Sequence, residues 1–252
     1  MQGSTRINGS VALVTGANRG IGLAITRAVL ERGATKVYAT ARDPKTLEAL
    51  REHYGARLVA LRMDVTDAEQ VAEAARQATE VDLLVNNAGA FEPTELTDDA
   101  IVDVARREME VNYFGVLRVL RSFADTLARR GGVIVNIGSA AGLTNVPLQP
   151  TYSASKAAQH SLTQAARALL AGRGISVHGV YPGPVDTDMT KDLPPQFEKT
   201  APDAVAKAIL DGVEAGEDDI FPDPFAVALG KQFHASPKTV ERQMAALVAV
   251  PA

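Results

Sequence analysis

The first predicted strand and the turn that follows it read Val11-Ala12-Leu13-Val14-Thr15-Gly16-Ala17-Asn18-Arg19-Gly20-Ile21-Gly22. Apolar residues then recur at helical spacing at Ile25, Ala28 and Val29, which predicts a strand, a glycine turn and a helix. Glycines let the backbone turn tightly and approach a pyrophosphate, whose negative charge is attracted by the free N–H groups at a helix start. The segment therefore predicts a phosphate cradle for a dinucleotide, although its glycine spacing differs from the usual G-x-G-x-x-G.

Short β-branched runs and amphipathic stretches of helical length alternate along the rest of the chain. The seven predicted strands are Val11–Thr15, Lys36–Thr40, Leu58–Met63, Asp82–Asn86, Val133–Ile137, Ile175–Val180 and Asp219–Phe221. The predicted helices are Gly20–Arg32, Pro44–Tyr54, Asp67–Thr79, Asp98–Ala128, Tyr152–Ala171 and Asp203–Ala215. This alternation predicts an α/β fold, a doubly wound parallel sheet of about seven strands with helices on both faces. We expect the longest helix to bend before Val111.

The alternation is not interrupted by a linker or an internal repeat, so we expect a single domain over residues 1–252. A proline-rich loop at about residues 184–199 is the candidate lid over a substrate cleft. The tail from Pro222 onward is weakly patterned, and a helix and an oligomer contact are both compatible with it.

Composition and charge exclude several classes of function. The 252 residues are 46% hydrophobic and 22% charged, as is usual for a globular domain, and the net charge of −4 argues against a nucleic-acid partner. There is no cysteine, and the four histidines lack metal-ligand spacing, so we expect no metal site. With no apolar run that resembles a signal peptide or a membrane span, we expect a cytoplasmic protein that does not bind membranes.

The end of the second predicted strand should contact the adenosine half of a dinucleotide, about 20 residues after the glycine turn. An acidic residue there accepts hydrogen bonds from the ribose hydroxyls and repels a 2′-phosphate. This chain has Ala41 and Arg42 instead. Because guanidinium groups pair well with phosphate oxygens, Arg42 and Arg19 are candidates for binding a 2′-phosphate. The sequence therefore favours NADP(H) over NAD(H).

Candidate reacting groups follow the fifth predicted strand. Tyr152 and Lys156 are four residues apart at the start of a predicted helix and should share one face of it. A nearby ammonium group favours the phenolate, so we expect Lys156 to lower the pKa of Tyr152. Ser139 follows the strand Val133–Ile137 and should place its hydroxyl at the carboxyl edge of the sheet, where ligands bind in open α/β folds.

These motifs together resemble those of the short-chain dehydrogenase/reductase family, in order and in spacing, over nearly the whole chain. The residues that carry the resemblance are the glycine turn Thr15–Gly22, Asp64-Val65, Asn86-Asn87-Ala88-Gly89, Asn112, Ser139, Tyr152 with Lys156, and Pro182-Gly183 with Thr187. The resemblance implies a single Rossmann domain and an oxidoreductase. It also implies a homodimer or homotetramer in which the two longest helices pack against their symmetry mates.

The resemblance implies a catalytic set of Asn112, Ser139, Tyr152 and Lys156. Tyr152 would be the acid/base, and Lys156 would lower its pKa and hold the nicotinamide ribose. Ser139 would polarise the substrate carbonyl, and Asn112 would sit in a helical kink and hold a water that relays protons to Lys156. The residues expected to bind the cofactor are Gly16, Asn18, Arg19, Gly20, Ile21, Gly22, Arg42, Asp64, Val65, Asn86, Ala88, Gly89, Tyr152, Lys156, Pro182, Gly183, Val185 and Thr187.

The leading functional hypothesis is an NADP(H)-dependent carbonyl reductase, because Thr40–Asp43 resembles the NADP-preferring carbonyl reductases of this family. Its expected substrate is a small, neutral, hydrophobic carbonyl or alcohol. The expected pocket lining is mostly apolar and comprises Phe91, Ala141, Leu143, Val146, Pro147, Gln149, Pro184 and the loop to Pro195.

Two alternatives remain at this stage. One is a 3-oxoacyl-carrier-protein reductase, which the acidic Glu92 and Glu95 disfavour because they would repel an acidic carrier protein. The other is a catalytically inactive NADP-binding sensor on the same fold. The sensor is disfavoured because all four positions of the catalytic set are present.

Overall fold

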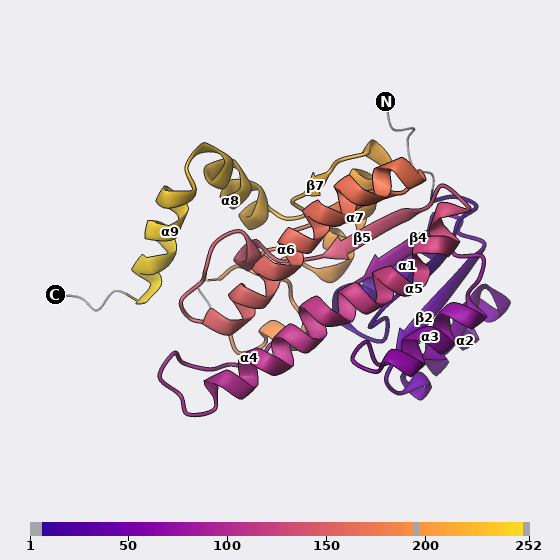
Figure 1. Cartoon of the computed structure of the whole chain (residues 1–252), viewed down its shortest axis with the longest axis horizontal. Helices are drawn as coiled ribbons and strands as arrows, with labels where there is room; N and C mark the ends of the chain where they lie inside the picture. Colours follow the sequence, from indigo (N-terminus) through magenta and orange to yellow (C-terminus); the bar gives the residue numbers. More distant parts are fainter. Residues whose placement is uncertain (1–6, 194–196, 249–252) are drawn as a thin grey trace.

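The computed structural model describes residues 7–193 and 197–248, and within these ranges seven parallel strands form one sheet in the order β3-β2-β1-β4-β5-β6-β7 (Figure 1). The strands are β1 (Val11–Val14), β2 (Lys36–Ala41), β3 (Leu58–Arg62), β4 (Leu83–Asn86), β5 (Val133–Ile137), β6 (Ser176–Val180) and β7 (Asp219–Ile220). Every predicted strand is confirmed, and each end lies within one residue of its predicted position. The order reverses between β1 and β4, and in such sheets ligands bind outside the carboxyl ends of the strands at this point.

Helices cover both faces of the sheet, as the sequence predicts. The helices are α1 (Gly20–Glu31), α2 (Glu48–Tyr54), α3 (Ala68–Gln77), α4 (Ile101–Met109), α5 (Val116–Ala128), α6 (Pro150–Leu170), α7 (Pro202–Ala215), α8 (Pro224–Ala235) and α9 (Pro237–Ala245). Helices α1 and α7 pack on one face, and α3, α5 and α6 pack on the other. None of the helices in the described part of the chain is long and apolar enough to cross a membrane.

Two hydrophobic cores result, one on each face. Successive strand residues alternate between them: Ala12 and Val14 face α1 and α7, whereas Leu13 faces α3, α5 and α6. Because both faces are buried, the strands read as continuous apolar runs rather than as an alternation of apolar and polar residues. This is the physical reason why the strand positions could be predicted from the sequence.

The longest predicted helix, Asp98–Ala128, is interrupted. Helix α4 is followed by a π-helical segment at Glu110–Gly115 and then by α5, and the three follow one another in Figure 1. The sequence predicts that this helix breaks or bends before Val111, and the α-helix does end at Met109, where the π-helical segment begins. The first three predicted residues are not helical, because the Asp98 carboxylate instead accepts hydrogen bonds from the Thr94 hydroxyl and the Glu95 N–H in a turn.

The tail after Pro222 forms two short helices, α8 and α9, which lie to one side of the sheet (yellow in Figure 1). Each begins with a proline after a capping residue, Asp223 for α8 and Ser236 for α9. Leu229 and Val240 pack against Ala140, next to Ser139. The pair of helices therefore supports one of the loops that build the candidate site.

Candidate active site

The glycine turn after β1 is fixed by hydrogen bonds to the segment after β4. The Thr15 hydroxyl accepts from the N–H groups of Asn87 (2.9 Å) and Ala88 (2.8 Å). In return, the Asn87 amide donates to the backbone carbonyls of Thr15 (2.8 Å) and Gly16 (3.1 Å). Thr15 and Asn87 belong to the motifs that carry the family resemblance, but they were not predicted to be catalytic or cofactor-binding residues. Their polar side chains at the ends of two neighbouring strands were the available signal.

The turn presents the start of α1 to the cleft. Gly16 (φ +64°) and Gly20 (φ +55°) adopt left-handed backbone conformations that side chains rarely take. Within the described residues, no side chain caps the first turn of α1, which also contains no acidic residue. Free N–H groups and a positive helix end without a competing carboxylate suit a pyrophosphate. Asn18 and Ile21 are half-buried in the same turn, where Ile21 packs on the core.

The loop after β6 reaches across to this turn. The Arg19 guanidinium pairs with the Asp188 carboxylate at 2.9 Å, and both side chains are exposed. A Cβ on Gly20 would lie 3.2 Å from Cγ2 of Thr187, so the Thr187 side chain packs closely on the glycine turn. Val185 forms a β-bridge with Thr200, which closes the loop at its base. Residues 194–196 of the predicted lid lie outside the described residues.

The adenosine end of the cleft lies at the carboxyl end of β2. Ala41 is buried and Arg42 is exposed, and the Thr40 carbonyl accepts from the Ala17 N–H (2.9 Å), which joins β2 to the glycine turn. The structure does not bring Arg19 and Arg42 together to bind one phosphate, because the Arg19 guanidinium pairs with the Asp188 carboxylate.

At the end of β3, the Asp64 carboxylate accepts from the backbone N–H (2.9 Å) and the hydroxyl (2.8 Å) of Thr66. Val65 is buried, and it packs closely on Gly115 at the end of the π-helical segment. Both expected adenine contacts are therefore held at the same edge of the sheet as the glycine turn.

Tyr152 lies in the first turn of α6 and is 9% exposed, beside the residues predicted to act with it. The Ser139 hydroxyl interacts with the phenol. Lys156 Nζ lies 5.8 Å from the centroid of the Tyr152 ring. The Phe91 ring packs edge-to-face on the Tyr152 ring, with the two centroids 5.4 Å apart. The structure thus brings Ser139, Tyr152 and Lys156 together at the carboxyl edge of the sheet.

The buried Lys156 amino group is held by the end of β5 and by Gln159 rather than by Tyr152. Nζ donates to the Ile137 carbonyl (3.0 Å) and to Oε1 of Gln159 (2.9 Å), and the Gln159 amide donates to the same carbonyl (3.2 Å). Gln159 was not predicted as a site residue. Its position one turn after Lys156 on the same helix was the only signal in the sequence.

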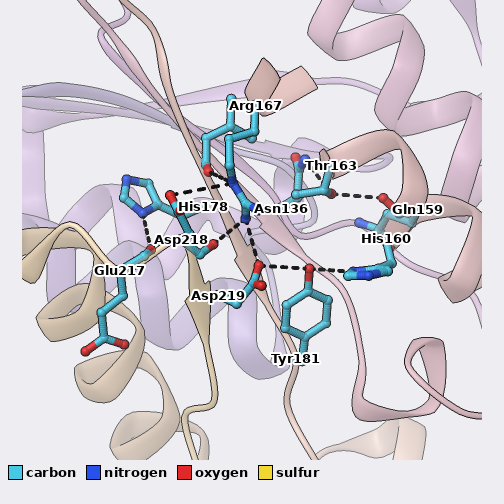
Figure 2. Close-up of polar contacts among 11 residues, drawn as sticks. Asn136, Gln159, His160, Thr163, Arg167, His178, Tyr181, Glu217, Asp218 and Asp219 are labelled. Carbon is cyan, nitrogen blue, oxygen red and sulfur yellow. Dashed lines mark hydrogen bonds and ion pairs between the residues drawn. The ribbon is translucent and has the colours of Figure 1, made fainter. Parts of the chain in front are cut away.

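A chain of buried side chains links α6 to the middle of the sheet. Asn86 Nδ2 donates to Asn136 Oδ1 (2.8 Å), Asn136 Nδ2 donates to Thr163 Oγ1 (3.0 Å), and Thr163 donates to the Gln159 carbonyl (2.9 Å). Figure 2 shows Asn136, Thr163 and Gln159 in this chain. The Asn86 side chain is therefore inside the sheet, so only its backbone is available to the cofactor cleft.

A second set of polar contacts ties α6 to β6 and β7 (Figure 2). Arg167 donates to the Val177 carbonyl (3.0 Å) and to the Asp219 carboxylate (2.7 Å). The ring of His160 contacts the Tyr181 hydroxyl through Nδ1 at 2.7 Å. Together these contacts fix the axis of the helix that carries Tyr152 and Lys156.

Asn112 lies in the π-helical segment and is fully buried. Its amide exchanges two hydrogen bonds with the backbone of Ala90, both 2.9 Å, and donates a third to the Ser155 hydroxyl (2.9 Å). A Cβ on Gly89 would lie 3.3 Å from Asn112 Oδ1 and 3.7 Å from Lys156 Nζ, so a side chain there would crowd the cleft. The water relay expected of Asn112 stays a prediction.

Comparison with known proteins identifies the family. A family model described as short chain dehydrogenase matches residues 10–198. The chain belongs to the short-chain dehydrogenases/reductases. A 3-oxoacyl-[acyl-carrier-protein] reductase from Vibrio harveyi is 34% identical over 239 residues, which cover 92% of each chain. A galactitol 2-dehydrogenase (L-tagatose-forming) from Cereibacter sphaeroides is 40% identical over 205 residues, 77% of this chain and 79% of that protein.

A solved structure supports the family and the fold together. A short chain dehydrogenase from Burkholderia cenocepacia J2315, crystallised in complex with NADP, is 38% identical to this chain and superimposes with a TM-score of 0.89. The match covers 95% of this chain and 99% of that one. The seven-stranded parallel sheet is therefore the Rossmann-type sheet of this oxidoreductase family.

The cleft of this short-chain dehydrogenase/reductase has a further anchor that sequence analysis missed. Asp223 is buried, and its carboxylate accepts from the N–H groups of Gly183 (2.8 Å) and Ala226 (2.8 Å). It therefore joins the Pro182-Gly183 segment to the first turn of α8. A Cβ on Gly183 would lie 2.6 Å from a ring carbon of Phe225, so only glycine fits this junction.

Burial controls the ionisation of the two central groups. It raises the pKa of Tyr152 to about 12, with a smaller opposing effect of the Ser139 hydroxyl, and it lowers the pKa of Lys156 to about 7. The expectation that Lys156 lowers the pKa of Tyr152 is therefore not met in this arrangement, because desolvation of the phenol outweighs the effect of its neighbours.

The lowered pKa of Lys156 has a consequence for stability. Between about pH 7 and its ordinary pKa of 10.5, Lys156 is protonated in the unfolded chain and mostly neutral in the native one. The unfolded state then binds more protons, so stability should rise with pH in this range, by at most about 1.4 kcal/mol per unit.

We expect the free energy of unfolding of the wild type to increase relative to that of Lys156→Met between about pH 7 and about pH 9. Denaturant titrations of both proteins at several pH values measure this difference. The effect of Tyr152 begins only near its ordinary pKa of 10 and does not interfere. A difference that stays constant with pH would contradict the buried, neutral amine.

Proposed function

We propose that this chain is an NADP(H)-dependent reductase that converts a ketone or aldehyde to an alcohol and also catalyses the reverse reaction. The observation that carries the proposal is the position of Tyr152, whose phenol lies with Ser139 and Lys156 at the edge of the sheet where the glycine turn begins α1. Asn112 belongs to the same set and holds the segment after Gly89. We assign the catalytic roles to these four residues.

In this mechanism, bound NADPH supplies the hydride. Tyr152 donates its phenolic proton to the carbonyl oxygen as negative charge develops there. Ser139 donates a second hydrogen bond to that oxygen and stabilises the same charge. Lys156 would hold the nicotinamide ribose, and the Pro182–Thr187 segment would cover the carboxamide.

The protonation state of the site suits the acid step of carbonyl reduction. A phenol whose pKa is raised to about 12 carries its proton at neutral pH and can donate it to the carbonyl oxygen. Oxidation of an alcohol starts from the phenolate and passes through the same transition state in reverse. The site therefore serves both directions, and the concentrations of substrates and products decide which one proceeds.

The cofactor proposal rests on charge at the carboxyl end of β2. Ala41 presents no carboxylate to a 2′-phosphate, and Arg42 is exposed and can bind one. The related structure from Burkholderia cenocepacia is a complex with NADP, which supports the same cofactor here. The glycines at 16, 20 and 22 and the uncapped start of α1 suit the pyrophosphate.

We propose a neutral, hydrophobic carbonyl as the substrate. The supporting observations are the Phe91 ring against Tyr152 and the small buried Ala141 beside Ser139. Leu143, with Phe233 and Met244 from the C-terminal helices, extends this apolar surface. The loss of NADPH absorbance across a panel of ketones and aldehydes tests the proposal.

The second candidate is reduction of a 3-oxoacyl group on a carrier protein. Curated relatives with this activity match most of the chain. The acidic residues that disfavour it carry less weight in the structure, because the Glu92 carboxylate forms a two-pronged pair with Arg107 (2.7 Å) and only Glu95 remains to repel a carrier. Comparing turnover of a carrier-linked 3-oxoacyl group with that of a free ketone separates the two candidates.

We further propose one domain over residues 1–252 and a homodimer or homotetramer built on α5 and α6. Among the apolar residues of these two helices, Val116, Leu120 and Ala166 are buried within the chain's own core and do not contribute to such an interface. The exposed apolar side chains on these helices are Leu117 (38% exposed) and Leu169 (76%), with Phe114 (42%) just before α5.

We expect light scattering at micromolar concentration to give the mass of two or four chains. Leu117→Glu with Leu169→Glu should shift that mass toward one chain, because charges on a buried contact oppose its formation. A monomer mass for the wild type would rule out the proposed assembly.

Tyr152→Phe should abolish turnover while NADPH still binds, since the change removes one hydroxyl and leaves Lys156 and its contacts in place. Positioned acid/base groups contribute about 10²–10⁴-fold to the rate. Steady-state kcat and cofactor fluorescence measure the two effects. A variant that retains more than about a hundredth of the wild-type kcat would refute the role of Tyr152.

Ala41→Asp combined with Arg42→Leu should invert the cofactor preference from NADPH to NADH. Charge-assisted hydrogen bonds from Arg42 to a 2′-phosphate should favour NADPH by about ten- to a hundredfold in the wild type. Measuring kcat/KM with both cofactors tests this expectation. Equal use of NADH by the wild type would show that Arg42 is a solvated surface residue.

A further inference from the structure

Glu108 on α4 is a fully buried carboxyl group that the catalytic roles above do not use. Its Oε1 accepts a hydrogen bond from the Glu92 N–H at 3.0 Å, whereas Oε2 forms no hydrogen bond of normal geometry within the described residues, although the Thr151 hydroxyl is close enough to lower the pKa of the carboxyl. Burial raises the pKa of this carboxyl. A buried carboxyl with one unpaired oxygen is costly, so its position calls for a reason.

The reason we see is a clamp on the segment after Gly89. Asn112 follows Glu108 by one helical turn, so the two side chains project from the same face. Asn112 holds the N–H and the carbonyl of Ala90, and Glu108 holds the N–H of Glu92. The backbone is thus fixed on both sides of Phe91.

Phe91 is the residue between the two fixed positions, and its ring packs edge-to-face on Tyr152 with an interplanar angle of 73°. On the outer side, Arg107 grips the Glu92 carboxylate with two nitrogens, at 2.9 Å and 2.7 Å. Neighbouring residues of one helix therefore hold Glu92 by its backbone and by its side chain. The ring of Phe91 has little freedom to leave Tyr152.

We propose that Glu108 is a positioning residue for substrate recognition: its carboxyl fixes the Glu92 backbone and so holds Phe91 as the wall that receives the apolar group next to the substrate carbonyl. The inference rests on the proposed reductase function. It assigns Phe91 the role of selecting apolar carbonyls. In this clamp Glu108 serves as a hydrogen-bond acceptor, a role that a glutamine oxygen can also fill, whereas its charge separately raises the pKa of Tyr152.

The test compares Glu108→Met, which removes the acceptor at similar size, with Glu108→Gln, which keeps one. The matched control is Glu110→Met on the neighbouring turn, whose carboxylate pairs with Arg118 and not with the segment after Gly89. Hydrogen–deuterium exchange of peptides covering residues 90–95 reports the clamp without any reference to activity. We expect faster exchange only in Glu108→Met.

The kinetic prediction is that the KM for the substrate changes and the KM for the cofactor does not. In Glu108→Met the KM for the best apolar ketone of the panel should rise about tenfold, because the partly buried Glu92 N–H loses its acceptor and Phe91 loses its fixed place. The KM for NADPH should not change, and Glu108→Gln should restore the wild-type values. The single variant Phe91→Ala should also raise the KM for the ketone. In the double variant with Glu108→Met, the KM should be little higher than in Phe91→Ala alone.

Unchanged exchange and KM in Glu108→Met would overturn the proposal, and so would additive effects in the double variant. If Glu108→Gln had the same effects as Glu108→Met, the charge of Glu108 rather than its hydrogen-bond acceptor would control exchange and KM. That result would also contradict the proposal. If Glu108→Met did not fold, Phe91→Ala would still decide whether the wall selects apolar substrates. A wild type that reduced no carbonyl would end the reductase proposal, whereas the exchange data would still decide whether Glu108 clamps residues 90–92.

Discussion

The position of helix α6 depends on a chain of buried hydrogen bonds that starts inside the sheet. Asn86 on β4 binds Asn136 on β5, and Asn136 binds Thr163 on α6. Two turns earlier on the same helix, Lys156 is held at the end of β5 by the Ile137 carbonyl. An unpaired buried polar group costs about 1–3 kcal/mol, so α6 cannot slide or turn without losing several such contacts. The place of the reacting tyrosine is therefore fixed from within the sheet.

The walls of the cleft are attached to this frame by polar contacts of the same kind. The glycine turn is held by Thr15 and Asn87, and the segment after Gly89 is held by Asn112 and Glu108. The segment after β6 is tied to α8 by Asp223. Each wall is thus a loop whose backbone is fixed by a polar side chain that lies in or directly beside a regular element, which is how loops at the edge of a parallel sheet can form a precise site.

The burial that keeps the site rigid also determines which of its groups carry a proton. Tyr152 and Lys156 are both nearly inaccessible, and desolvation moves their pKa values in opposite directions, each toward the neutral form. A neutral phenol beside a carbonyl can donate its proton to the carbonyl oxygen. The same dry environment strengthens the hydrogen bonds that act on a developing negative charge.

The sequence by itself determined the sheet, the helices on both faces and the residues of the family's motifs. It could do so because strands buried on both faces read as apolar runs, and because the glycine turn is a local signal. Only the tertiary structure decided that Arg19 pairs with Asp188, that Glu108 reaches the Glu92 backbone, and that burial raises the pKa of Tyr152. These facts depend on which distant segments meet and how much water they exclude. The spacing of residues along one helix or strand determines neither which distant segments meet nor how much water they exclude.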